Sequence, residues 1–197
     1  MTGGVYIIGA AMTAFGKRMN DSVKSLTAET VRSALKDADI EASAIEAAWF
    51  SNTRQPMLEG QNTVRGEIAL RPLGITGVPI ANVENACASG STALLQAVNA
   101  IRAGMAEVGL VVGAEKMVFP DQPERVAAAF AGGTDVVRGL EASAELRLLF
   151  LRQQREPVDG LNVVIEASQR CGGGEGQGGI RHATSPCGAS CGADLGC

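Results

Sequence analysis

The chain has 197 residues, of which 46% are hydrophobic and 4% aromatic, with a net charge of −4 and a pI near 5.1. This length allows one or two domains, and the apolar content suffices for a core of Ala, Val, Ile and Leu. The acidic balance argues against a nucleic-acid-binding surface, and no apolar run approaches the ~20 residues of a membrane span. The first residues lack the pattern of a signal peptide, so we expect a cytoplasmic protein.

The first fifty residues predict a strand, a helix and a second strand. Residues 4–10 are a short apolar run with β-branched residues, which indicates a central strand. Asp21 and Ser22 offer an N-cap, after which apolar residues recur at helical spacing over residues 23–38. Residues 43–46 have capping-box spacing but leave room for only one turn or a loop. Residues 47–51 then form a strand, whose two aromatic side chains, Trp49 and Phe50, belong to the core.

The next stretch continues this alternation. Residues 52–60 are a polar loop, and residues 61–70 can form a helix. A short apolar run that opens with Pro79 predicts a buried strand. Residues 88–103 predict a helix that is apolar nearly all round, which is typical of a helix buried in a core. Residues 108–113 are a further strand, so the pattern indicates an α/β fold with much parallel pairing.

Cys87 lies between the strand after Pro79 and the buried helix. The first turn of a helix carries unpaired N–H groups and a partial positive charge, and both stabilise a thiolate. The same N–H groups could hold the oxyanion that forms when a thioester carbonyl is attacked. A single cysteine before a helix is also compatible with an inert, buried thiol, and its position leaves both interpretations open.

Three motifs resemble those of thiolases, in the same order. Residues 85–91, Asn-Ala-Cys-Ala-Ser-Gly-Ser, resemble the nucleophile motif, in particular that of the branch related to sterol carrier protein and other lipid-transfer thiolases. Residues 60–65, Gly-Gln-Asn-Thr-Val-Arg, are similar to the motif that precedes it. Residues 113–117, Gly-Ala-Glu-Lys-Met, are similar to the motif after the next strand, with Ala114 in place of a glycine. The resemblance covers about residues 4–150.

The resemblance implies the N-terminal half of a thiolase. The expected fold is a mixed, mostly parallel sheet with the nucleophile helix inside an α/β/α arrangement. Cys87 becomes the catalytic nucleophile, with its backbone N–H as an oxyanion donor. Arg65 is expected near the active site or a dimer contact, whereas Glu115 looks structural. Residues 118–150 would form a loop region that covers the site and helps to bind coenzyme A. The sequence of this region by itself predicts an irregular stretch with short helical pieces, one of them near residues 140–151.

The implied reaction is acyl transfer through a cysteine thioester. In thiolases the acyl-enzyme meets either coenzyme A, in thiolytic cleavage of a 3-ketoacyl-CoA, or a carbanion from acetyl-CoA, in Claisen condensation. Coenzyme A thioesters are therefore substrates, and no separate cofactor or metal is expected. The lipid-transfer branch implies a bulky or branched acyl group. Thiolases associate through the nucleophile domain, so the resemblance also implies a homodimer.

The resemblance ends near residue 150, and residues 151–197 read as a Gly- and Cys-rich tail. Residues 161–165 could form one strand, but we expect disorder from about residue 168, because little apolar surface remains to offset chain entropy. The Gly-x-Gly-x-x-Gly pattern at residues 174–179 lacks the strand and helix of a dinucleotide site. The tail also holds a possible zinc set with no standard ligand spacing, formed by His182, Cys187, Cys191 and Cys197.

A thiolase also needs a second half, which supplies a Gly-His-Pro motif and a second cysteine in a Cys-x-Gly motif. The one histidine, His182, precedes Ala183, and the tail cysteines at 187 and 191 read Cys-Gly. We therefore expect an incomplete site. Our hypothesis is that the tail is not a thiolase second half but an out-of-frame or spliced terminus. Three functions stay open: a thiolase-type acyltransferase, an inactive thiolase-like domain that binds coenzyme A or a partner subunit, and a subunit of a steroid side-chain retro-aldolase.

Overall fold

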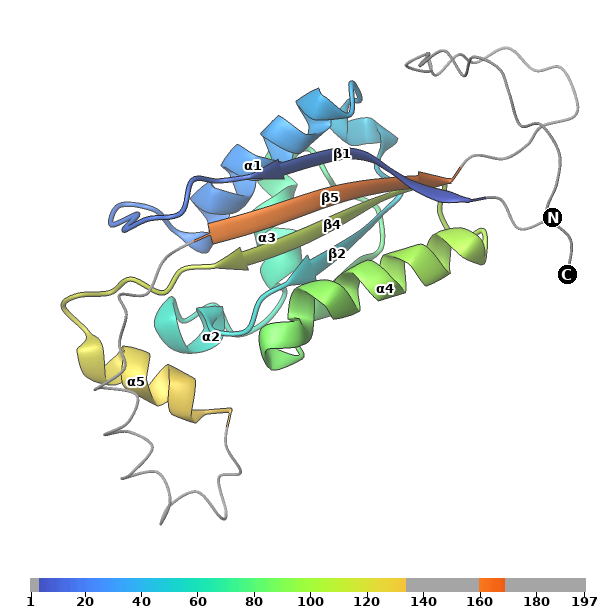
Figure 1. Cartoon of the computed structure of the whole chain (residues 1–197). Coiled ribbons are helices and arrows are strands. Elements are labelled where there is room, and N and C mark those ends of the chain that lie inside the picture. Colours follow the sequence, from blue (N-terminus) through green and yellow to red (C-terminus); the bar gives the residue numbers. More distant parts are fainter. Residues whose placement is uncertain (1–3, 134–159, 169–197) are drawn as a thin grey trace, which may run out of the picture.

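The computed structural model describes residues 4–133 and 160–168, which form one sheet with helices on both faces (Figure 1). The strands and helices, in chain order, are β1 Val5–Met12, α1 Val23–Asp37, β2 Ala47–Ser51, α2 Gln55–Leu58, α3 Arg65–Leu70, β3 Ile80–Val83, α4 Ser89–Arg102, β4 Val108–Glu115, α5 Pro123–Ala131 and β5 Gly160–Ser168. Short 3₁₀ turns, η1 Ala42–Ala44, η2 Arg71–Leu73 and η3 Ala86–Ala88, join some of them.

The sheet has the strand order β1-β5-β4-β2-β3. β2 pairs in parallel with β3 and with β4, whereas β5 is antiparallel to both of its neighbours, β4 and β1. Four strands therefore run in one direction and β5 runs in the other. This arrangement confirms the predicted α/β class and the mixed, mostly parallel sheet.

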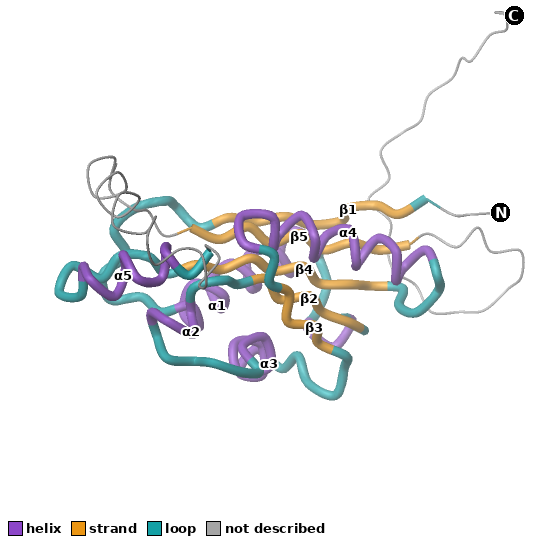
Figure 2. Tube along the Cα trace, turned by 90° about the horizontal axis from the view of Figure 1, so that it is seen from below, coloured by secondary structure: helices purple, strands orange, loops and turns teal. Residues whose placement is uncertain are grey.

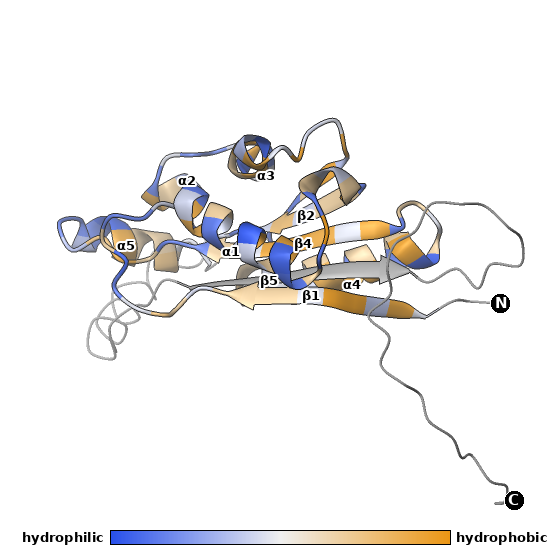
Figure 3. Cartoon of the chain, turned by 90° about the horizontal axis from the view of Figure 1, so that it is seen from above, coloured by the Kyte–Doolittle hydropathy of each residue, from blue (hydrophilic) through white to orange (hydrophobic). Residues whose placement is uncertain are grey.

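Helices cover the two faces of the sheet in separate layers. Alternate residues of β2 point to opposite faces, so Phe50 joins the core under α1 and α3 while Trp49 joins the core under α4. Figure 2 shows α4 lying across the strands on one side, and Figure 3 shows α1 and α3 on the other. The three-layer α/β/α prediction is confirmed, as is the core role of both aromatic residues.

Helix α1 has the boundaries and the buried face that the sequence predicts. Ser22 is the N-cap, and its hydroxyl accepts a hydrogen bond from the Ser25 N–H at 3.1 Å, while the Ser25 hydroxyl accepts one from the Ser22 N–H at 2.9 Å. Glu59 adds a carboxylate at this end, which accepts a hydrogen bond from the Val23 N–H at 2.9 Å. The buried face consists of Val23, Leu26, Thr27, Thr30, Val31 and Ala34.

Two strands predicted to be internal lie at the edges of the described sheet. β1 pairs only with β5 among the described strands, and its Tyr6 and Ile7 side chains are exposed. The half of β1 nearer the N-terminus is strongly hydrophobic (Figure 3). β3 forms the other edge, where Val83 alone is fully buried. An apolar run predicted these strands, but it could not show that β5 lies between β1 and β4.

Helix α4 ends as expected, with Gly104 in a left-handed conformation (φ 73°) two residues after Arg102. The prediction that it is buried all round is wrong for the described part of the chain. Ala93, Ala97 and Ile101 face the sheet, whereas Leu95 on the outer side is 61% exposed. The alanine and leucine residues of this helix predict an apolar surface on all sides, but the described part of the chain packs against only one side of it.

Three segments outside the main predicted helices and strands contain defined elements. The predicted loop 52–60 contains α2, whose Gln55 N–H donates to the Asn52 side chain at 3.0 Å. The loop region 118–150, for which the sequence predicts short helical pieces, contains α5, which packs on α2 through Leu58 and Val126. The predicted strand at 161–165 forms as β5, so the sheet extends past residue 150, where the sequence placed the end of the domain. The helical piece predicted near 140–151 and the tail from residue 169 lie outside the described residues.

Candidate active site

Cys87 lies at one edge of the sheet, where several parallel strands end. β2, β3 and β4 run in the same direction, so their carboxyl ends meet at this edge, and η3 and the start of α4 follow β3 there. Ligand sites of open α/β sheets lie outside the carboxyl ends of the strands. Cys87 is a free, exposed cysteine in η3, two residues before α4 begins at Ser89. The predicted position at the amino end of a helix is confirmed.

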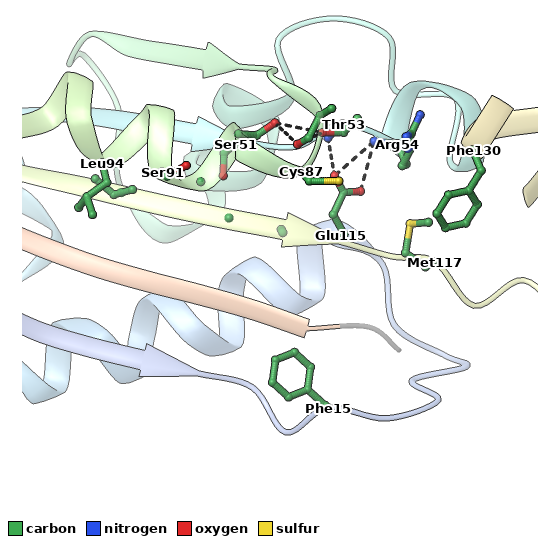
Figure 4. A pocket seen from close by; sticks show the side chains of 16 residues that line it. Phe15, Ser51, Thr53, Arg54, Cys87, Ser91, Leu94, Glu115, Met117 and Phe130 are labelled. Carbon is green, nitrogen blue, oxygen red and sulfur yellow. Dashed lines mark hydrogen bonds between the residues drawn. The ribbon is translucent and has the colours of Figure 1, made fainter. Parts of the chain in front are cut away.

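A cavity of about 620 Å³ opens beside this cysteine (Figure 4). Its walls come from the ends of β2 and β4, from η3 and the first turns of α4, and from α5 and the loop after β1. The lining is largely apolar apart from hydroxyls, one carboxylate and one guanidinium. The side chains that line it include Phe15, Ser51, Thr53, Arg54, Cys87, Ser89, Ser91, Leu94, Val111, Glu115, Met117 and Phe130.

The turn that carries the thiol has an unusual backbone. Ala86 has φ 46°, which places a residue with a Cβ in the left-handed region. Its carbonyl oxygen accepts a hydrogen bond from the Ser89 hydroxyl at 2.7 Å, and the Thr53 hydroxyl approaches the same oxygen at 3.2 Å. The Ser89 hydroxyl also accepts from the Asn85 N–H at 2.8 Å. Hydroxyls from two elements therefore hold the peptide directly before the thiol.

Glu115 is the carboxylate in the cavity wall, at the end of β4. It accepts hydrogen bonds from the backbone N–H groups of Thr53 and Arg54 (Figure 4). It also accepts one from the Asn52 side-chain amide at 3.3 Å. Burial raises the pKa of the Glu115 carboxyl, and the Thr53 and Arg54 N–H groups oppose that rise because they stabilise the carboxylate. Glu115 thus links the end of β4 to the loop after β2.

Arg65 contacts the loop after β2 but is not among the side chains that line the cavity. Its guanidinium donates to the Asn52 backbone oxygen at 2.8 Å and to the Asn52 side-chain oxygen at 3.1 Å. Arg54 lies at the cavity itself, where its guanidinium stands 5.6 Å from the centre of the Phe130 ring and donates to the Ala129 carbonyl. The structure therefore brings Arg65 near the site through Asn52, as the resemblance implies.

Sequence reasoning missed Thr53 and treated Glu115 as structural alone. A signal for Thr53 was present, because three polar residues, 52–54, directly follow a fully buried strand. The end of a buried strand is where polar side chains of a site gather. No sequence pattern indicated that Thr53 would reach the turn before Cys87, since 33 residues separate Thr53 from Ala86.

The other candidates from the sequence lie outside the described residues. These are the possible zinc ligands and the Gly-x-Gly-x-x-Gly stretch of the tail, together with His182. Within residues 4–133 and 160–168, no cluster of His, Cys, Asp and Glu side chains could hold a metal ion. In the same ranges, no helix combines the length and apolarity that crossing a bilayer requires.

Comparison with known sequences supports the resemblance. The model of the thiolase N-terminal domain matches residues 5–142. Bovine (Bos taurus) sterol carrier protein 2 is 39% identical over 116 residues, which are 58% of this chain and 20% of the relative. Acetyl-CoA acetyltransferase of Methanocaldococcus jannaschii is 38% identical over 113 residues, which are 57% of this chain and 29% of the relative. The match thus spans less than a third of these curated relatives.

Solved structures agree on the fold. A structure of Xanthomonas campestris OleA aligns with a TM-score of 0.61 at 15% identity, covering 85% of this chain and 57% of that chain. The 3-oxoacyl-[acyl-carrier-protein] synthase III of Aquifex aeolicus aligns with a TM-score of 0.58 at 15% identity, covering 83% and 54%. At this identity the likeness establishes the architecture alone. With the domain match over residues 5–142, the three motifs and the sheet that places Cys87 at its carboxyl edge, this chain belongs to the thiolase family.

Proposed function

We propose that this chain carries the nucleophile half of a thiolase-type acyltransferase and that Cys87 accepts the acyl group of an acyl-CoA. The thiolate attacks the thioester carbonyl, the bond to the coenzyme A sulfur breaks, and the cysteine thioester and free coenzyme A form. The observation that carries this proposal is an exposed, free Cys87 at the amino end of α4, facing a cavity of about 620 Å³. The partial positive charge of the helix terminus favours both the thiolate and the oxyanion.

The cavity supports an acyl group as the transferred part of the substrate. Its volume falls within the ~300–1,000 Å³ range typical of small-molecule sites. Leu94, Met117 and Phe130 contribute apolar surface, which matches the hydrocarbon chain of a bulky acyl group better than a short polar one. Xanthomonas campestris OleA, which shares the fold, has been crystallised with bound lauric acid and lauroyl-CoA. We therefore propose a medium or bulky acyl-CoA as substrate.

Complete turnover requires groups that the described residues do not supply. A second substrate must be deprotonated, and histidine is the usual base for such a step. The one histidine of the sequence, His182, lies outside the described part of the chain. We infer that the acid/base group comes from residues outside this part or from a partner chain. A thiolase-like domain that binds coenzyme A without turnover is the alternative that this observation favours.

Acylation of the purified chain tests the proposal. The protein is incubated with lauroyl-CoA or acetyl-CoA, coenzyme A release is followed with a thiol reagent, and the acylated peptide is located by mass spectrometry. The tryptic peptide 66–102 contains Cys87 as its one cysteine, so modification can be assigned. We expect one acyl group on this peptide, faster loading from lauroyl-CoA, and no loading in Cys87→Ala. Cys171→Ala, which removes a tail cysteine, serves as the matched control and should load as the parent does.

The result also separates the two functions. Continuous cleavage of acetoacetyl-CoA that depends on Cys87 would establish a complete thiolase and contradict the incomplete site. One equivalent of acyl group without turnover is the outcome that we expect. If neither the parent nor the control is acylated on Cys87, the acyltransferase proposal fails and the binding-domain alternative stands.

We further propose that two copies associate through this domain. β3 is the edge strand opposite β1, so its outer backbone groups have no strand partner among the described residues. Apolar side chains of the neighbouring α3 segment, Val64 and Ile68, are also exposed. Sedimentation velocity over a range of concentrations should show a dimer, and a monomer at every concentration would contradict this assembly.

A further inference from the structure

The peptide before the nucleophile is strained, and a residue far away in the sequence holds it. Ala86 adopts φ 46°, a conformation that residues with a Cβ avoid, and Cys87 follows it directly. Such strained residues persist only where the surrounding structure holds them in place. η3 is a single turn and its three residues are exposed, so hydrophobic packing within η3 does not fix this backbone.

The Ala86 N–H donates to the Glu84 carboxylate at 2.8 Å within the turn, and the hydrogen bonds at the Ala86 carbonyl add a restraint from outside it. Ser89 is the first residue of α4, which follows the turn directly, and its hydroxyl donates to the Ala86 carbonyl at 2.7 Å. Thr53 comes from the loop after β2, and its hydroxyl lies 3.2 Å from the same carbonyl and 3.1 Å from the Ser89 hydroxyl. The Ser89 hydroxyl donates its proton to the Ala86 carbonyl. The Thr53 hydroxyl can then donate either to the Ala86 carbonyl or to the Ser89 hydroxyl oxygen. In either arrangement Thr53 ties the turn to the sheet.

Thr53 can act as a tether because its own backbone is fixed. Its N–H donates to the Glu115 carboxylate, and the preceding residue, Asn52, donates to the Ala114 carbonyl through its side chain. Both partners belong to β4, which lies in the interior of the sheet. A rigid support of this kind is what holds a reactive group in its productive orientation.

We propose that Thr53 is a positioning residue that sets the reactivity of Cys87 through the Ala86 peptide. Its hydroxyl holds Ala86 in the left-handed conformation, and this conformation directs the Cys87 side chain into the cavity beside the first N–H groups of α4. The role deepens the proposed function, because an acyl-accepting thiol gains from a fixed orientation toward the thioester carbonyl. Thr53 acts through Cys87 and needs no contact with the substrate.

Alkylation of Cys87 by iodoacetamide tests the proposal without any acyl-CoA. The rate is measured on peptide 66–102 by mass spectrometry at several pH values, with far-UV circular dichroism as the check of folding. Thr53→Val keeps the shape and removes the hydroxyl, and we expect it to slow alkylation by about fivefold to tenfold, the effect of losing one hydrogen bond. Thr53→Ser restores the hydroxyl and should react within about twofold of the parent.

The matched control is Thr30→Val, which removes a buried hydroxyl from α1 on the other face of the sheet. It should leave the Cys87 rate unchanged. Glu84 accepts a hydrogen bond from the Ala86 N–H at 2.8 Å, and Arg54 and Glu115 line the same cavity as Cys87. These titratable side chains are the same in all variants, so a change in the pH profile reports the turn itself.

Two outcomes would overturn the proposal: Thr53→Val reacts as fast as the parent, or Thr53→Ser is as slow as Thr53→Val. If Thr53→Val does not fold, Thr53→Ala takes its place, since it also removes the hydroxyl that lies 3.2 Å from the Ala86 carbonyl. Slower alkylation of that variant supports the restraint, and an unchanged rate contradicts it. Failure of acyl transfer from acyl-CoA would leave these rates untouched, so the two proposals are tested separately.

Discussion

Glu115 is a charged side chain set in the wall of a largely apolar cavity. Burial raises the pKa of its carboxyl, and backbone N–H groups of Thr53 and Arg54 limit that rise. A carboxyl whose pKa is higher in the folded chain than in the unfolded chain binds its proton more tightly when folded. Its contribution to stability is therefore present below the ordinary pKa of 4.5 and is lost as the pH rises through the folded-state pKa.

We expect Glu115→Gln to remove this pH dependence. The free energy of unfolding of the parent, relative to that of the variant, should fall as the pH is raised from about 4 toward neutrality. Urea unfolding followed by circular dichroism at several pH values measures the difference. Asp21→Asn provides the contrast, because hydrogen bonds from Ser25 and Arg18 lower the pKa of Asp21 and its contribution is lost as the pH falls below 3.8. A parent–variant difference at Glu115 that rises with pH would contradict this assignment.

The contact between β1 and α1 depends on a glycine. A Cβ at Gly9 would lie 2.7 Å from the Ala34 carbonyl oxygen and 2.7 Å from the Ala38 Cβ. These atoms belong to the helix backbone and to a small side chain that cannot turn away, so the strand and helix would have to separate. The close approach allows α1 to cover the sheet at its β1 edge.

Gly9→Ala should lower the free energy of unfolding by about 1–3 kcal/mol, the usual effect of overpacking a close contact. Chemical denaturation at neutral pH measures it. Gly16→Ala is the matched control, because nothing lies within 4 Å of a Cβ added there. Its effect should stay within about 0.5 kcal/mol, as for an ordinary surface substitution. An equal loss in both variants would show that the close approach at Gly9 has no specific effect.

β5 decides whether the sheet of the whole molecule is continuous. It pairs with β1 over residues 5–12 and with β4 over residues 108–115, so it joins the first strand of the chain to the strands that carry the site. Without it, β1 would have no strand partner in the described sheet, and one side of β4 would be unpaired. The segment after residue 150 is therefore part of the domain in its residues 160–168.

Truncation of the chain tests this role. A chain that ends at residue 150 lacks β5, and we expect it to lose the cooperative unfolding transition because two ladders of hydrogen bonds are missing. A chain that ends at residue 168 keeps all described strands and should unfold cooperatively. Circular dichroism during thermal unfolding compares the two. A cooperative transition in the shorter chain would show that the sheet forms without β5.

Local patterns in the sequence determined most elements and the nucleophile. Helical spacing and the Ser22 cap predicted α1, and the position of Cys87 before a helix, together with three motifs, predicted the family. These features depend on residues close together in the chain. Periodicity and capping are local properties of the backbone, which is why the sequence alone could reveal them.

The tertiary structure alone decided the strand order, the exposure of α4 and the residues that line the cavity with Cys87. The sequence of β5 does not indicate that this nine-residue strand lies between β1 and β4. The alanine-rich sequence of α4 does not indicate which side of the helix remains exposed. Thr53 and Glu115 line the same cavity as Cys87 because three strands bring their carboxyl ends to one edge. Contacts between residues so far apart in the chain depend on strand pairing and packing, and no local pattern encodes them.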